Sequence, residues 1–136
     1  MEDSSSLAER QSKAKEVQQL KRKASKEIAK GDLDKAVDTL TQMMAVRKAI
    51  LKMLKSSQQD ASEEKIATAH TLKLFGEVLV EKGDLLNAER AFGDALKLFK
   101  KGSSQKQEQG DQEKKAVQEV KSHLKRLHAM NSKNVG

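Results

Sequence analysis

Apolar residues recur three, four or seven positions apart along most of this 136-residue chain. Before the first internal glycine, Gly31, they are Leu7, Ala14, Val17, Leu20, Ala24 and Ile28. This spacing places them on one face of an α-helix. A β-sandwich or barrel draws its strands from aromatic and β-branched residues and its turns from Gly and Pro. Because the chain has 2% aromatic residues, seven Gly and no Pro, we expect an all-α fold.

The same periodicity predicts five helices, which should pack in an antiparallel manner. Their expected ranges are residues 6–30, 33–55, 63–82, 85–101 and 111–130. Residues 102–110 are a low-complexity segment without apolar side chains to bury, so we expect a linker there. Residues 1–5 and 131–136 are expected to be disordered ends of a single helical domain at 6–130.

The positive charge of the chain is concentrated at its two ends. The net charge is +7, and residues 31–100 balance eleven Lys or Arg against eleven Asp or Glu. Residues 1–30 have eight basic and five acidic side chains, and residues 101–136 have eight and four. This distribution indicates a candidate basic patch. The alternative is that these side chains form an ordinary solvated helix surface. The members of the patch are Lys21, Arg22, Lys23, Lys26, Lys30, Lys121, Lys125 and Arg126.

A repeated tripeptide indicates two similar helical units. Gly31-Asp32-Leu33 and Gly83-Asp84-Leu85 lie 52 residues apart, each between two amphipathic segments. Around the second copy, large and small residues alternate in a way that lets two antiparallel helices approach closely. We expect these residues to form the structural core of the unit: Leu72, Phe75, Gly76, Leu79, Gly83, Ala88, Phe92 and Ala95.

This run resembles a tetratricopeptide repeat (TPR), a helix-turn-helix unit with small and large residues at fixed positions. The long second helices and the wide spacing are similar to the extended repeats of kinesin light chains. The resemblance implies helical hairpins, with repeat one at about residues 17–55 and repeat two at about residues 63–101. It implies that helix 111–130 is a capping helix or, as the alternative, the first half of a third repeat. It also implies a groove that binds a segment of a partner protein. The groove positions are Gln18, Lys21, Ser25, Ile28, His70, Lys73, Glu77 and Val80.

Residues typical of catalysis are scarce, so we expect no enzymatic activity, no metal and no cofactor. The chain has no cysteine, and no Gly-rich phosphate loop follows either Gly-Asp-Leu. His123 and His128 are five positions apart, whereas two helical ligands of one metal are three or four apart. The three histidines are therefore expected to face solvent.

A protein-binding scaffold or adaptor is the function that the sequence favours. Two alternatives stay open: a basic helical protein that binds nucleic acid, and a structural subunit of a cytoskeletal or other large complex. The three phenylalanines occupy core positions, which argues against base stacking. No apolar run is long enough for a membrane span, and the start of the chain does not resemble a secretory signal. We expect an intracellular protein in the cytoplasm, with the nucleus as the alternative.

Overall fold

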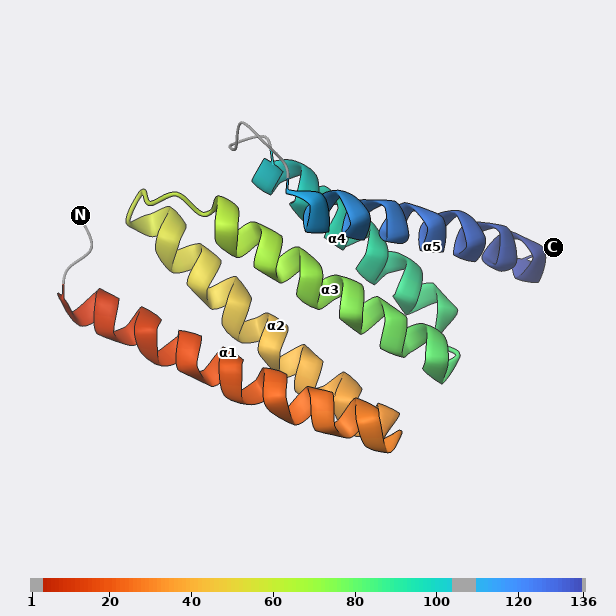
Figure 1. Cartoon of the computed structure of the whole chain (residues 1–136), viewed down its shortest axis with the longest axis horizontal. Helices are drawn as coiled ribbons and strands as arrows, with labels where there is room; N and C mark the ends of the chain where they lie inside the picture. The colour runs from red at the N-terminus through yellow and green to blue at the C-terminus, as the bar shows by residue number, and fades with distance from the viewer. Residues whose placement is uncertain (1–3, 104–109, 136) are drawn as a thin grey trace.

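The computed structural model describes residues 4–103 and 110–135, and helices account for all of their regular secondary structure (Figure 1). In chain order the helices are α1 (Ser4–Lys30), α2 (Leu33–Ser56), α3 (Ser62–Lys82), α4 (Leu85–Ser103) and α5 (Asp111–Val135). The prediction of an all-α fold with five helices is confirmed for this part of the chain.

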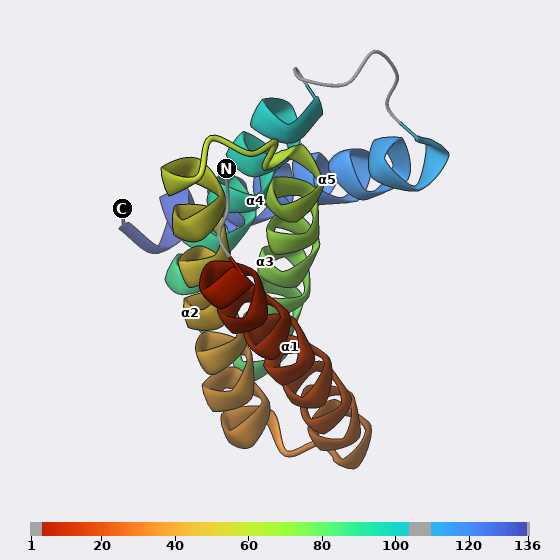
Figure 2. The same ribbon diagram turned by 90° about the vertical axis from the view of Figure 1, so that its left-hand side faces the viewer.

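Helices α1 to α4 form two antiparallel hairpins that pack on each other in two layers. α1 pairs with α2, α3 pairs with α4, and the hairpins meet mainly through α2 and α3. From the side, α1 and α3 lie in the right-hand layer, and α2 and α4 lie in the left-hand layer (Figure 2). α5 packs mainly on α4, with a smaller contact to α3, and lies across both helices in the view of Figure 2.

Each hairpin turns at the predicted glycine. Gly31 and Gly83 have φ angles of +77° and +88°, in the left-handed region that glycine adopts without steric strain. Asp84 Oδ1 then accepts a hydrogen bond from the backbone N–H of Asn87 at 3.4 Å, which caps α4. At the equivalent position in the first hairpin, Asp32 precedes α2 but its side chain makes no capping hydrogen bond. The repeated tripeptide thus marks two similar turns, of which only the second is followed by a helix with an aspartate side-chain cap.

Three helices, α1, α4 and α5, extend two or more residues beyond their predicted ends. α1 begins at Ser4, within the segment predicted to be disordered, because nothing in its first residues breaks a helix. α5 continues to Val135, and Asn131 anchors its last part by donating to Glu89 Oε2 at 2.5 Å. The periodicity of apolar residues could not reveal this polar contact. Residues 1–3, 104–109 and 136, which include most of the predicted linker, lie outside the described residues.

The third extension, that of α4 to Ser103, brings Gly102 into the packed interior. Gly102 is buried where the end of α4 meets the start of α3. A Cβ atom at Gly102 would lie 2.6 Å from Ile66 Cγ1 and 3.0 Å from the carbonyl oxygen of Ser62. Because glycine has no Cβ, the two helix ends can make this contact. Gly102 was predicted to begin the linker, but it is a packing residue.

Six of the eight predicted core residues of the second hairpin are buried, whereas Phe75 is half-buried and Gly83 is exposed at the turn. Phe92, Ala88 and Ala95 are fully inaccessible to solvent. Gly76 is also buried, and a Cβ added to it would lie 2.8 Å from two ring atoms of Phe92. The absence of a side chain at Gly76 therefore lets the Phe92 ring lie directly against the backbone of α3. Leu72 and Leu79 are also buried, whereas Phe75 is half-buried between the two hairpins.

The first hairpin has a polar pair in its core. Glu27 of α1 is 9% exposed and accepts a hydrogen bond from Thr39 Oγ1 of α2 at 2.5 Å. The pair lies beside an apolar cluster that includes Val17, Ala24 and Leu40. A buried carboxylate needs such a partner, because burial removes its hydrogen bonds to water. The Thr39 hydroxyl therefore lets this carboxylate be buried beside the apolar cluster.

The glycine at position 76 allows a direct test of this packing. Gly76→Ala should lower the free energy of unfolding by about 1–2 kcal/mol, because the new methyl group would collide with the Phe92 ring. Gly93→Ala is the matched control in the adjacent helix, since no atom lies within 4 Å of its added Cβ. The control should raise stability by up to about 1 kcal/mol through helix propensity. Urea unfolding followed by circular dichroism measures both, and equal effects would contradict the predicted collision.

Candidate functional site

The predicted groove residues of α1 are mostly open to solvent. Gln18, Lys21 and Ser25 are exposed, whereas Ile28 is half-buried and packs against the apolar cluster of the first hairpin. Three of the four side chains on α1 are therefore available to a partner.

The groove residues of α3 are largely engaged by the rest of the chain. Lys73 Nζ lies 2.9 Å from Glu119 Oε2 of α5 and 3.5 Å from Glu77 Oε2 of its own helix. Val80 packs against the core of the second hairpin, and His70 is exposed. α5 thus occupies part of the surface that the sequence assigned to a partner.

The ion pair between α3 and α5 changes the acidity of both groups. Partial burial lowers the pKa of Lys73, but the hydrogen bond from its ammonium to Glu119 and the charge of Glu77 outweigh this effect and raise the pKa above its usual value. The Lys73 ammonium in turn lowers the pKa of Glu119. Both groups are therefore charged at neutral pH, and the attraction between them helps to hold α5 on α3.

His123 makes the main aromatic contact of α5. Its imidazole stacks on the Phe92 ring, with centroids 4.6 Å apart and planes within 9° of parallel. Its Nε2 lies 3.8 Å from Glu77 Oε2, and the side chain is 24% exposed. The expectation that all histidines face solvent is therefore wrong for His123. His128 does face solvent, with 79% of its side chain exposed.

His70 lies where α1 and α3 face the same region. Its ring meets Phe99 edge-on at 4.9 Å. Partial burial lowers the pKa of His70, and the positive charges of Lys73, Arg47 and Lys21 lower it further. Glu113 of α5 acts in the opposite direction. Lys21 belongs to α1, so the charge of an exposed groove residue on that helix reaches His70, although α1 and α3 are not among the helix pairs that pack closely. We call Gln18, Lys21, Ser25 and His70 the α1–α3 surface.

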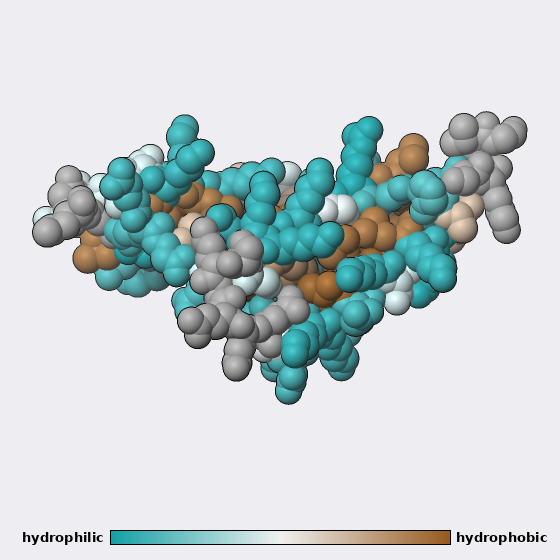
Figure 3. Space-filling view, turned by 90° about the horizontal axis from the view of Figure 1, so that it is seen from above, coloured by the Kyte–Doolittle hydropathy of each residue, from teal (hydrophilic) through white to brown (hydrophobic). Residues whose placement is uncertain are grey.

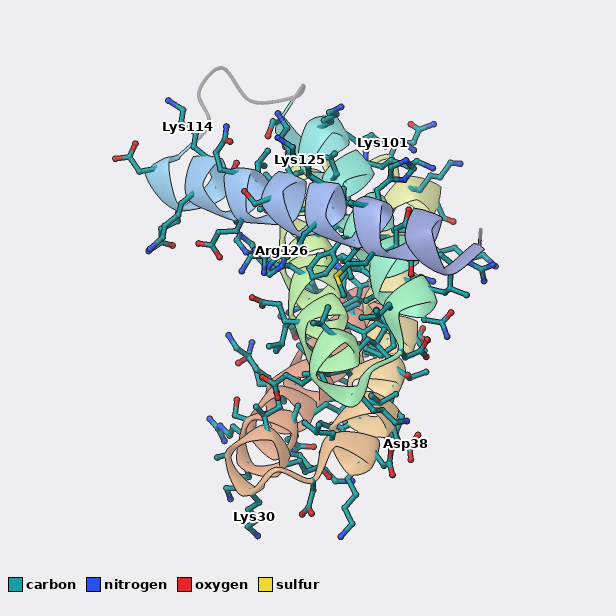
Figure 4. The ribbon with its side chains drawn as sticks, turned by 90° about the vertical axis from the view of Figure 1, so that its right-hand side faces the viewer. Lys30, Asp38, Lys101, Lys114, Lys125 and Arg126 are labelled. Carbon is teal, nitrogen blue, oxygen red and sulfur yellow. The ribbon has the colours of Figure 1, made fainter. Side chains whose placement is uncertain are left out.

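The candidate basic patch is not one patch. All eight of its residues are exposed, but Figure 4 shows Lys30 at one end of the molecule and Lys125 and Arg126 at the other. Lys30 therefore does not share one surface with Lys125 and Arg126. Spacing along the chain could not show this separation, because it depends on how the hairpins stack.

The sequence did not predict a buried ion pair between the hairpins. Arg47 of α2 is 9% exposed, and its Nη1 donates to Glu64 Oε1 of α3 at 3.1 Å. Burial raises the pKa of Glu64, and the Arg47 charge opposes that shift only in part. One signal was present: Arg47 lies three residues from both Met44 and Ile50 on the apolar face of α2.

Four cavities that the structure describes lie outside the predicted groove. The largest, about 650 Å³, is at the ends of α2 and α4, and another of about 610 Å³ lies beside α4 and contains Leu86 and Leu124. Smaller cavities of about 310 Å³ and 270 Å³ contain Phe75 and Ala14, respectively. The eight groove residues line none of these four. From above, apolar areas alternate with hydrophilic side chains (Figure 3).

The described residues contain no group of three or more His, Cys, Asp or Glu side chains placed to hold a metal ion. Within the same ranges, no helix combines the length and the apolar character that a membrane crossing needs. No family model, curated protein or solved structure matches the chain. The contacts and charges of the described residues are therefore the basis for any functional assignment.

The stacking of His123 on Phe92 predicts its contribution to stability. His123→Ala should lower the free energy of unfolding by about 1–2 kcal/mol, because it removes a stacked ring from a buried phenylalanine. His128→Ala is the matched control on the same helix and should change stability by less than about 0.5 kcal/mol. Chemical unfolding gives both values, and hydrogen exchange of α5 amides should accelerate only in the first variant. Equal exchange in the two variants would contradict the role of His123.

The lowered pKa of His70 predicts a dependence of stability on pH. Because the folded pKa is below the ordinary value of 6.5, the unfolded chain binds the proton more readily. The contribution of His70 should be complete above pH 6.5 and should decrease as the pH falls below it. Unfolding of the wild type and of His70→Gln between about pH 7.5 and about pH 5.5 measures this contribution. The wild type should lose stability relative to the variant as the pH falls, and a constant difference would contradict the assignment.

Proposed function

We propose that this chain is a non-catalytic scaffold or adaptor with TPR-like hairpins, which binds a segment of a partner protein on the α1–α3 surface. The observation that carries the proposal is the two-layer stacking of the hairpins, which places α1 and α3, the first helices of the two hairpins, in the same layer (Figure 2). A shared surface formed by successive first helices is the usual arrangement for binding in helical repeat proteins.

The chemistry of the α1–α3 surface suits a polar, extended segment. Gln18 provides an amide, Ser25 a hydroxyl and Lys21 a cation, all exposed. Lys73, three residues after His70 on α3, is engaged by Glu119 of α5 at 2.9 Å and is therefore less available to a partner. A partner with an acidic side chain opposite Lys21, and hydrogen-bonding groups on either side, would complement this surface.

A protein partner also fits better than nucleic acid. Lys30 lies far from Lys125 and Arg126, so the basic residues of α1 and α5 do not all lie on one track for a phosphate backbone (Figure 4). Phe92 and Phe99 are fully buried, and Phe75 is half-buried in the core. None of the three phenylalanines therefore offers an open stacking platform.

Photocrosslinking in the native cell tests the α1–α3 surface. A photoreactive amino acid at Ser25 should crosslink a defined partner, which mass spectrometry then identifies. Lys21→Glu, introduced beside the crosslinker, should reduce the yield about tenfold through repulsion of an acidic partner segment. Lys26→Glu is the matched control, because residue 26 lies about 140° around the helix from Lys21 and carries the same charge.

Equal yields in the two charge variants would contradict the proposal. Crosslinks from Ser25 to nucleic acid instead of protein would replace it with the nucleic-acid alternative. The ratio of partner to bait in the purified complex also separates a scaffold from a structural subunit. A constant stoichiometric ratio at every dilution would favour the structural subunit.

A further inference from the structure

The largest described cavity lies where three helix ends meet. Its volume is about 650 Å³, and it lies between the last turns of α2 and α4 and the first turn of α3. Figure 4 labels Lys101, one of its lining residues, at the end of α4 and well away from Lys30 and Lys114. We call this cavity the lysine pocket.

Four lysines surround the lysine pocket, with a single acidic residue among its lining side chains. The lysines are Lys52, Lys55, Lys65 and Lys101, and the acidic residue is Asp60. Asp60 is already hydrogen-bonded at the start of α3. Its Oδ1 accepts hydrogen bonds from the backbone N–H and the hydroxyl of Ser62 at 2.9 and 2.6 Å. In the ranges that the structure describes, Lys52, Lys55 and Lys65 form no ion pair.

Favourable interaction with a helix dipole explains only two of the four lysines around the pocket. Lys55 and Lys101 stand in the last turns of α2 and α4, where a cation favours the helix dipole. Lys52 lies earlier in α2, and Lys65 follows the first turn of α3, where a cation does not favour the dipole. The end of α2 is also closed by its own backbone, because the N–H of Gln59 donates to the carbonyl oxygen of Leu54 at 2.9 Å.

The floor of the lysine pocket is apolar. Leu51, Ala61 and Leu98 line it, and all three are half-buried. Cations around an apolar floor complement a ligand that carries negative charge beside an apolar group. A hydrated anion without an apolar group would make no favourable contact with Leu51 and Leu98.

The groups around the lysine pocket favour carboxylates over phosphates. Its lining contains no arginine, which would bind a phosphate through two parallel hydrogen bonds. It also contains no aromatic side chain on which a base could stack. The N–H of Ser62, at the start of α3, is already bonded to Asp60 and is not offered to a phosphate.

We propose that the lysine pocket binds an acidic peptide segment of a partner protein, with an apolar side chain on the leucine floor and flanking carboxylates on the lysines. This pocket shares no residue with the α1–α3 surface. A partner could therefore occupy both surfaces, or two partners could bind at once. The proposal stands independently of the function proposed for the α1–α3 surface.

Fluorescence anisotropy with two synthetic probes tests this proposal on the full-length protein. The first probe is a labelled peptide of repeated Glu-Glu-Leu units, and the second has Gln in place of every Glu. At about 50 mM salt the acidic probe should bind the wild type at least about tenfold more tightly than the neutral probe. A labelled DNA duplex at the same salt concentration reports affinity for phosphates.

Two variants locate the binding. Lys52→Glu/Lys65→Glu should weaken binding of the acidic probe by at least about tenfold. Leu51→Gln keeps every charge and should weaken it several-fold through loss of the apolar floor. Lys23→Glu/Lys26→Glu is the matched control, because it makes the same change in net charge on exposed residues of α1. Circular dichroism at matched concentration checks that each variant keeps its helices.

Three results would overturn the proposal. Equal weakening in both double variants would mean that binding follows net charge and not the pocket. Equal binding of the acidic and neutral probes would remove the role of the lysines. Tighter binding of the duplex than of the acidic probe, lost in Lys52→Glu/Lys65→Glu, would reassign the pocket to nucleic acid.

Discussion

The ring of Phe92 connects three helices. It projects from α4 and lies against the backbone of Gly76 in α3. The imidazole of His123 from α5 stacks on the ring. Because the ring is fully buried, its position sets both how closely α3 and α4 approach and where α5 can lie. A larger residue at position 76 would move the ring, and a displaced ring would no longer present a flat surface to His123.

The placement of α5 determines which part of the predicted groove stays exposed. α5 contacts α3, where Glu119 pairs with Lys73, so part of the predicted groove is occupied by the chain itself. The open part moves toward α1, where Gln18, Lys21 and Ser25 stay exposed. The far end of α5 is held on α4 by the hydrogen bond from Asn131 to Glu89. α5 is thus held by a polar contact near each end, Lys73–Glu119 and Asn131–Glu89, and by the stack of His123 on Phe92 between them.

The sequence predicted most of the fold within each hairpin but not the contacts between separate elements. Gly31 and Gly83 marked the turns, and the alternation of Gly76 and Phe92 marked the closest packing, because these features depend on neighbours along the chain. The position of α5 depends on tertiary contacts across a predicted linker. Helical periodicity therefore identified α5 as a helix without indicating its direction. For the same reason, the basic residues of α1 and α5 were grouped together, although Lys30 lies far from Lys125 and Arg126.

The balanced charge of the middle segment conceals a local imbalance. Residues 31–100 contain equal numbers of acidic and basic side chains, but the fold distributes them unevenly. Acidic groups such as Asp60 and Glu64 are bonded to Ser62 and Arg47. Lys52 and Lys65 stay unpaired within the described ranges and border the same apolar floor. A positive pocket therefore forms in a segment without net charge, because folding pairs acidic groups there and leaves lysines exposed beside leucine side chains.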